Sequence, residues 1–352
     1  MTAFLDRIGI ALPVIQAPMA GVQGSALAIA VSNAGGLGSL PCAMLTPDQI
    51  RAEVTVIRSA TSRPFNLNFF CHTPPVPDAA REATWRAALL PYFEELALDP
   101  ATISTGPGRA PFTSEAALLV EELRPRVVSF HFGLPSKELM VRVKSVGTFV
   151  LSSATTVEEA VWLEAHGADA VIAQGVEAGG HRGMFLTDDI STQTGTMALV
   201  PQMANAVKVP VIAAGGIADA RGVQAALDLG AAAVQIGTAY LLCPEATTSK
   251  VHRAALRSGS SRHTVLTRVF SGRPARGIVN RIIQELGSMN EAAPEFPLAS
   301  LALAPLRAKA ESMGLDDFSP LWSGENASGC AEIPAGELTR RMAEKGSSWS
   351  SL

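Results

Sequence analysis

The chain has 352 residues, of which 47% are hydrophobic and 17% are charged, and its formal net charge is −4 at pH 7. A chain of this length can bury about three quarters of the surface that it exposes when unfolded, so a large core is expected. The slight negative charge, without any block of lysine or arginine, argues against nucleic acid or an anionic membrane surface as the partner.

Apolar segments and cysteines indicate the cellular compartment in which a protein resides. No apolar run reaches the ~18 residues that span a bilayer, and the first twenty residues lack the basic and apolar regions of a signal peptide. The cysteines show no paired spacing, which predicts neither a disulfide framework nor a zinc or other metal site; they are Cys42, Cys71, Cys243 and Cys330. We therefore expect a cytoplasmic protein without a bound metal.

Short strands and helices alternate along the first 236 residues. The predicted strands cover 12–18, 36–40, 65–69, 126–130, 148–152, 170–172, 210–214 and 233–236. The predicted helices cover 26–32, 46–60, 78–97, 114–123, 136–146, 156–166, 197–207 and 219–230. Thr46 with Gln49, and Thr156 with Glu159, have the spacing of capping boxes at two of the helix starts. The proline-rich connection 71–115 is long, which predicts an insertion beside a site.

Eight strands in this alternation predict an α/β fold, a parallel (β/α)8 barrel of the TIM type. A doubly wound sheet is the alternative, but short strands without a long hydrophobic centre favour closure. The alternation stops over 246–319, which we expect to form a small, mostly helical cap domain. The barrel domain then covers 1–245 and is completed by about 320–352, with a helix over 334–345 and a disordered serine-rich end.

A candidate site follows from this fold, because barrel enzymes have their active sites at the carboxyl ends of the strands. The loop after residue 174 contains four glycines around His181, which is the only side chain in the loop that titrates near neutral pH. A simple glycine-rich turn is the alternative interpretation. The other strand ends place at the same edge Pro18, Met19, Asn68, His131, Gln174, Gly215, Gly216, Gln235, Gly237 and Thr238.

Two adjacent loops predict a phosphate-bearing ligand. Gly215-Gly216 follows the seventh strand and Gly237-Thr238 follows the eighth, where barrels bind phosphate through backbone N–H groups. Tight turns explain one such loop easily and two less well. The sequence has no Gly-Lys-Ser/Thr motif of the Walker type and no dinucleotide fingerprint after a strand.

Several ordered motifs resemble the class I nitronate monooxygenases, formerly called 2-nitropropane dioxygenases. The resemblance covers residues of about 10–330 and rests on QAPMAG (16–21), SNAGGLGSL (32–40), FNLNFF (65–70), FHFGLP (130–135), GVEAGGHRG (175–183), PVIAAGGIAD (210–219) and VQIGTAYL (234–241). It implies a barrel that binds flavin mononucleotide (FMN), with a small added domain.

The resemblance also implies roles for the site residues. Pro18, Met19 and Asn68 would contact the isoalloxazine ring, and Gln174, Gly179 and Gly180 would contact the ring edge and ribityl chain. Gly215, Gly216 and the run Gln235, Ile236, Gly237 and Thr238 would hold the phosphate. His181 would be the active-site histidine, and His131 is associated with the same class.

The implied reaction is the oxidative denitrification of an alkyl nitronate such as propionate 3-nitronate, with O₂, to a carbonyl compound and nitrite. The main alternative is a flavin- and NAD(P)H-dependent enoyl-acyl-carrier-protein reductase, which has similar SNAGGLG, EAGGH and AAGGIAD motifs. A non-catalytic flavin-binding barrel is the second. The physiological substrate and the oligomeric state stay open.

Some residues depart from the family motifs or have no role in the implied reaction. Glu325 stands where the family motif has glutamine, which would alter the polarity of the site if it faces the flavin. Arg273, Arg276 and Arg281 are candidates for binding a substrate carboxylate, with solvated helix faces as the commoner alternative. The remaining histidines are expected at loops, helix ends or the surface; they are His72, His166, His252 and His263.

Overall fold

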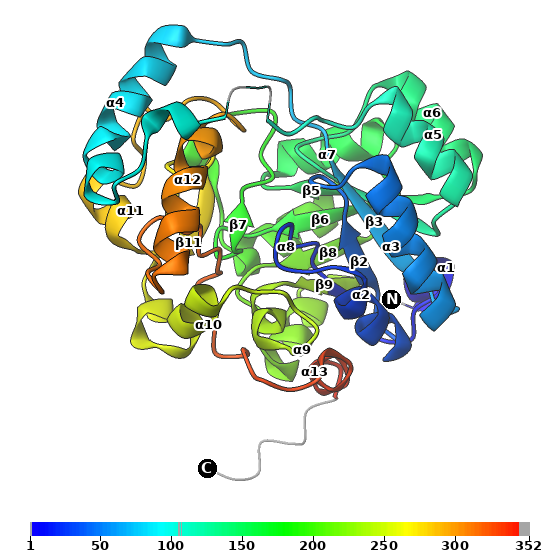
Figure 1. Cartoon of the computed structure of the whole chain (residues 1–352). Coiled ribbons are helices and arrows are strands. Elements are labelled where there is room, and N and C mark those ends of the chain that lie inside the picture. The colour runs from blue at the N-terminus through cyan, green and yellow to red at the C-terminus, as the bar shows by residue number, and fades with distance from the viewer. Residues whose placement is uncertain (1, 105, 107, 345–352) are drawn as a thin grey trace.

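The computed structural model describes the chain except for residues 1, 105, 107 and 345–352. Eight strands form one parallel sheet in the order β1-β9-β8-β6-β5-β4-β3-β2. A parallel bridge between Ile15 and Leu37 joins the strands at the two ends of this order, so the sheet closes into a barrel (Figure 1). The predicted (β/α)8 fold is therefore confirmed.

The barrel strands lie close to their predicted positions. They are β1 (Val14–Gln16), β2 (Gly38–Pro41), β3 (Phe65–Phe70), β4 (Val127–His131), β5 (Phe149–Ala154), β6 (Ala170–Gln174), β8 (Val211–Ala214) and β9 (Ala233–Ile236). The helices around them are α2 (Ser25–Asn33), α3 (Pro47–Ala60), α5 (Ser114–Leu123), α6 (Lys137–Ser145), α7 (Val157–Ala165), α8 (Thr196–Ala206), α9 (Ala220–Asp228) and α13 (Ala335–Met342).

The eighth barrel helix comes from the far end of the sequence. Helix α13 contacts both α2 and α9, and the Tyr240 hydroxyl lies 2.8 Å from the Thr339 hydroxyl. The helix is shorter than the predicted 334–345, and the serine-rich end lies outside the described residues. An N-terminal helix that the sequence did not suggest, α1 (Thr2–Ile8), packs Phe4 and Ile8 in one cluster with strand residues such as Phe149.

Polar side chains occupy part of the barrel interior. Asn66 and Asn68 are two residues apart on β3, so both point to the same face of the strand. Nδ2 of Asn66 donates to the hydroxyls of Ser39 (3.0 Å) and Ser129 (2.8 Å), and Nδ2 of Asn68 donates to Ser129 Oγ (2.9 Å). These bonds explain how two amides are tolerated in a buried strand.

A second body of structure flanks the barrel (Figure 1). Its hydrophobic cluster combines α4 (Ala79–Glu95) with α11 (Arg281–Leu286) and α12 (Ala299–Ser312), and Nε1 of Trp85 donates to the Ala299 carbonyl at 3.2 Å. This second body also contains α10 (Lys250–Arg257) and two strands that the sequence did not indicate. β10 (Thr264–Thr267) and β11 (Ala275–Ile278) form an antiparallel sheet with β7 (Gly180–His181).

The two predicted capping boxes differ in outcome. At α3, Thr46 accepts from the Gln49 N–H and Gln49 accepts from the Thr46 N–H, as predicted. At α7, Thr156 caps the helix, but the Glu159 carboxylate accepts from the N–H groups of Thr155 and Phe185 instead of completing the box. Glu159 is fully buried, and these donors satisfy its charge while they hold the chain beyond β7. Among the described residues, no helix is both long and apolar enough to cross a bilayer.

Candidate active site

One cavity lies at the carboxyl ends of the barrel strands. Its lining includes every site residue that the sequence predicted, from all parts of the barrel; these are Pro18, Met19, Asn68, His131, Gln174, Gly179, Gly180, His181, Gly215, Gly216, Gln235, Ile236, Gly237 and Thr238. Residues up to 220 positions apart in the chain meet here because parallel strands end at the same edge of the barrel.

The loop that carries His181 is held by buried polar side chains. Gln174 donates to the His181 carbonyl (2.9 Å) and accepts from the Gly183 N–H (2.7 Å), so its amide closes the base of the loop. Arg182, which is fully buried, donates to the carbonyls of Gly175 (2.7 Å) and Gln174 (2.6 Å). Arg182 is therefore a structural residue of the loop, and it does not line the cavity.

His181 is placed by a short strand at the edge of the cavity. Its partner in β11 is Ala275, and its Nε2 lies 2.8 Å from the Ser271 hydroxyl. Burial, followed by the nearby positive charge of Arg109, holds the pKa of His181 well below its usual value of 6.5. The ring is therefore neutral near pH 7, and its Nδ1 has no partner within the described part of the chain.

His131 supports the same loop. Its Nε2 lies 3.2 Å from the His181 carbonyl, which can only accept, so Nε2 carries the proton and Nδ1 accepts from the Ser153 hydroxyl at 3.0 Å. Burial lowers the pKa of His131 to about 3. With both ring nitrogens engaged by the protein, this geometry supports a positioning role toward His181.

Four backbone N–H groups on one side of the cavity are free to bind an anion. Neither strand pairing nor any other hydrogen bond among the described residues uses the N–H groups of Gly215, Gly216, Gly237 and Thr238. Thr238 also begins a 3-10 helix, Thr238–Leu242, whose first N–H groups point away from the helix. These four residues are half-buried and line the cavity, so this cluster of free amides indicates a ligand that accepts from several of them.

Several cavity residues were not predicted as site residues, and three of them bear on the chemistry of the site. Arg109 comes from the connection between β3 and α5, Trp322 follows the small domain, and His252 lies on α10. His252 lies in the first turn of α10, within the expected loop, helix-end or surface positions, but its side chain is only 4% exposed. Its Nε2 has no hydrogen-bond partner among the described residues, and burial lowers its pKa to about 4.

His72 lies in a loop, as expected, but its side chain is also buried. It is 4% exposed, and its Nε2 donates to the Arg109 carbonyl at 3.1 Å. His166, by contrast, is exposed at the end of α7 and stacks on Trp162 with 3.8 Å between ring centroids, and His263 is exposed, as predicted. No local pattern distinguishes these four histidines, since burial depends on contacts between distant segments.

The arginine candidates and Glu325 have partners within the protein. Nη2 of Arg276 lies 2.9 Å from Oε1 of Glu325, so this carboxylate is paired, and Glu325 does not line the cavity. Arg281 binds Glu95 at 2.7 Å on the surface. Arg273 lies 4.3 Å from the centroid of the Phe132 ring and donates to the Met184 carbonyl. None of the three arginines lines the cavity.

Comparisons with known proteins agree with this site. A family model described as nitronate monooxygenase matches residues 2–345. The chain is 44% identical to a nitronate monooxygenase of Pseudomonas aeruginosa, with 97% of the chain and 98% of the relative covered. It is 43% identical to a nitronate monooxygenase of Paraburkholderia phytofirmans, with 97% of the chain and 93% of the relative covered.

Two solved structures extend the comparison. Nitroalkane oxidase from Streptomyces ansochromogenes has a TM-score of 0.87 and 38% identity, with 97% of the chain and 96% of that protein covered. FabK from Thermotoga maritima has a TM-score of 0.73 and 29% identity, with coverages of 97% and 94%. The family match over nearly the whole chain, together with these relatives, shows that the chain belongs to the nitronate monooxygenase family of oxidoreductases.

Proposed function

We propose that the chain is an FMN-dependent nitronate monooxygenase, which uses O₂ to convert an alkyl nitronate, such as propionate 3-nitronate, into a carbonyl compound and nitrite. The observation that carries the proposal is a single cavity with an anion-binding cluster of backbone amides at one side and the neutral His181 at another. The printed names of the relatives, nitronate monooxygenase and nitroalkane oxidase, support the same reaction class.

The cavity residues fit FMN. The four free N–H groups after β8 and β9 suit a phosphate monoester, and Oε1 of Gln235 is buried without a partner among the described residues, as expected if it accepts from a ligand. Gly180 has no atom within 4 Å of the position that a Cβ would take, so its backbone borders open space. When bound, the flavin would supply electron transfer from the substrate and reaction with O₂.

The protein residues would bind and orient the nitronate. A neutral His181 can stabilise the anion only by a hydrogen bond, so the positive charge must come from elsewhere in the cavity. Arg109 lines the same cavity and has no carboxylate partner in the described part of the chain. We infer that Arg109 balances the charge of the nitronate, while His181 orients the nitro group and accepts a proton when the substrate is a neutral nitroalkane.

The alternative activity is that of a nicotinamide-dependent enoyl reductase, because the structure is also similar to that of FabK. Anaerobic mixing of the purified yellow protein with propionate 3-nitronate, and separately with NADH or NADPH, distinguishes the two. We expect a change of the flavin absorbance with the nitronate and none with either nucleotide. Bleaching by a nucleotide with indifference to nitronate would favour the reductase, and turnover of any nitronate would exclude a non-catalytic flavin-binding barrel.

We also propose a cytoplasmic location for the protein. We further propose that the small domain, which consists of the predicted 246–319 together with α4, forms a cap beside the cavity. The location is supported by four cysteines that are all free thiols, two of them, Cys42 and Cys243, buried. The cap is supported by the hydrophobic cluster that α4 shares with α11 and α12 and by His252 of α10, which reaches the cavity.

A further inference from the structure

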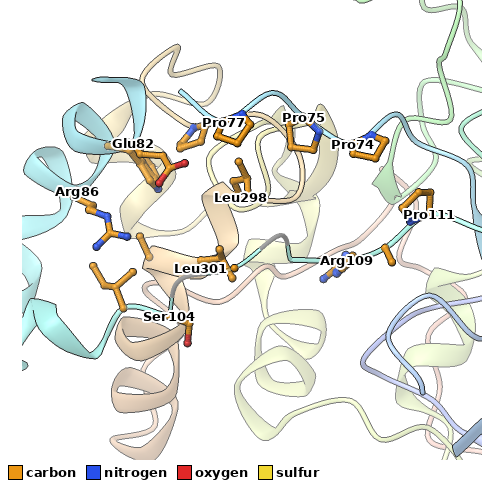
Figure 2. A pocket seen from close by; sticks show the side chains of 16 residues that line it. Pro74, Pro75, Pro77, Glu82, Arg86, Ser104, Arg109, Pro111, Leu298 and Leu301 are labelled. Carbon is orange, nitrogen blue, oxygen red and sulfur yellow. The ribbon is translucent and has the colours of Figure 1, made fainter. Parts of the chain in front are cut away.

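A second cavity of about 450 Å³ lies between α4, α12 and the proline-rich segment after β3 (Figure 2). Most of its lining is apolar and includes Pro74, Trp85, Leu298 and Leu301. Figure 2 shows Leu298 and Leu301 beside the prolines of the segment, with Glu82 and Arg86 at one end. Such a cavity suits an apolar group, because removing apolar surface from water is favourable.

Arg109 connects this cavity to the candidate active site, since its side chain lines both. Its guanidinium carbon lies 5.9 Å from the centroid of the Phe296 ring, and that ring centroid is 5.2 Å from the centroid of the His181 ring. Arg109 therefore lies at the boundary of the two spaces, and the Phe296 ring is near both Arg109 and His181. The hydrogen bond from the buried His72 to the Arg109 carbonyl holds the backbone at this boundary.

The charge at the boundary calls for an anion. Arg109 makes no ion pair with a carboxylate in the described part of the chain, and it is mostly shielded from solvent. Burial and the neighbouring positive charge of Arg307 lower the pKa of Arg109, and its nearest recorded partner for the charge is the neutral Phe296 ring. A ligand with its negative charge at Arg109 would compensate this cation.

We propose that the second cavity receives the apolar chain of an alkyl nitronate whose charged end lies between Arg109 and His181. The inference rests on the proposed function and assigns this cavity to those of its substrates whose unbranched alkyl chain is long enough to pass Arg109. A short nitronate with a second carboxylate, such as propionate 3-nitronate, would stay within the candidate active site, because its second charge is disfavoured against the apolar lining.

Unbranched carboxylates test the inference without turnover, because a carboxylate has the planar shape and single negative charge of a nitronate group. Calorimetric titration of the flavin-loaded protein with the series from propionate to octanoate should show an affinity that rises about threefold for each added methylene once the chain reaches the cavity. Leu301→Trp, which fills the cavity, should flatten this dependence. Leu118→Trp on the exposed face of α5 is the matched control and should keep it.

Two results would overturn the inference. One is an affinity that does not depend on chain length, or that depends on it equally in Leu301→Trp. The other is a loss of the chain-length dependence in Leu118→Trp that is as large as in Leu301→Trp. If Leu301→Trp does not fold, Leu298→Trp repeats the test from the start of α12.

Arg109→Met distinguishes the contribution of the positive charge to ligand affinity from that of the ligand's alkyl chain. It should weaken binding of every member of the series by about 10- to 100-fold, while the dependence on chain length stays as in the unmodified protein. The proposed function is tested separately by turnover of ethyl nitronate, which is too short to require the second cavity. Carboxylate binding does not depend on turnover, so failure of one proposal is distinguishable from failure of the other.

Discussion

The protonation states of single side chains decide how the candidate site can work. His131 and His181 both have lowered pKa values and are neutral near pH 7, but their environments differ. Both ring nitrogens of His131 bind protein groups, whereas only Nε2 of His181 has a partner in the described part of the chain. The nitrogen left free on His181 makes it the better candidate for contact with the substrate.

His181→Ala should therefore affect two substrates unequally. A neutral nitroalkane must lose a proton before oxidation, and we expect its kcat/KM to fall by about 100-fold or more, as for the loss of a general base. A nitronate is already deprotonated and should lose less than about tenfold. Steady-state oxygen consumption with both substrates measures this, His166→Ala on the surface is the control, and equal losses would contradict the assigned role.

Glu325→Gln tests whether the departure from the family motif matters for the reaction. Since Glu325 pairs with Arg276 and does not line the cavity, we expect an unchanged flavin spectrum and an unchanged KM for nitronate. The pair is half-exposed on the Glu325 side, so its loss should lower the free energy of unfolding by about 1 kcal/mol or less. Urea unfolding and kinetics measure the two effects, and a shifted flavin spectrum would show that the carboxylate does reach the ring.

The loop of residues 175–183 is the element that combines close packing with an open face. A Cβ on Gly179 would lie 2.5 Å from the Gly324 nitrogen, so only glycine allows the approach of the chain after Trp322. Gly180, the next residue, has a φ of +74° and open space around its missing Cβ. One side of the loop is thus fixed against the protein and the other faces the cavity.

Gly180→Ala and Gly147→Ala form a matched pair for this loop. Gly147 has a φ of +80° and similarly open surroundings, but it follows α6 and does not line the cavity. Each substitution should cost about 1–2 kcal/mol of unfolding free energy for the left-handed backbone. Only Gly180→Ala should weaken retention of FMN, by about tenfold or more, measured from flavin fluorescence after dilution. Equal retention in the two variants would count against a ligand at Gly180.

For the whole molecule, buried neutral histidines make stability depend on pH. Their folded pKa values lie below the ordinary 6.5, with His131 at about 3 and His252 at about 4, so the unfolded chain binds more protons between these limits. The contribution of these histidines to the free energy of unfolding should be fully present above pH 6.5. It should fall as the pH decreases toward 3, by up to about 1.4 kcal/mol per pH unit for each histidine. Chemical unfolding of the flavin-free protein at several pH values measures the slope. His131→Gln should make the dependence of the unfolding free energy on pH shallower. An unaltered slope would show that His131 does not contribute to this dependence.

The sequence by itself determined the barrel and most of its candidate site. Strand length, glycine turns and helix caps are local properties, and eight repeats of them leave one closed arrangement in which all strand ends meet. His181, Gln174 and the glycines after β8 and β9 could be predicted because they lie at the end of a barrel strand or in the loop that follows it. Helix α1, the short strand β7, the packing of α4 in the small domain and the exact ends of the elements were missing from that picture.

The tertiary structure alone decided which residues from other segments join the site. Arg109 and His252 do not directly follow a barrel strand, and they reach the cavity from the long connection between β3 and α5 and from α10. Strand β11 pairs with both β10 and β7, which is far from it in the sequence, and Glu325 pairs with the buried Arg276. These outcomes depend on contacts between distant residues, to which local periodicity and propensity do not respond.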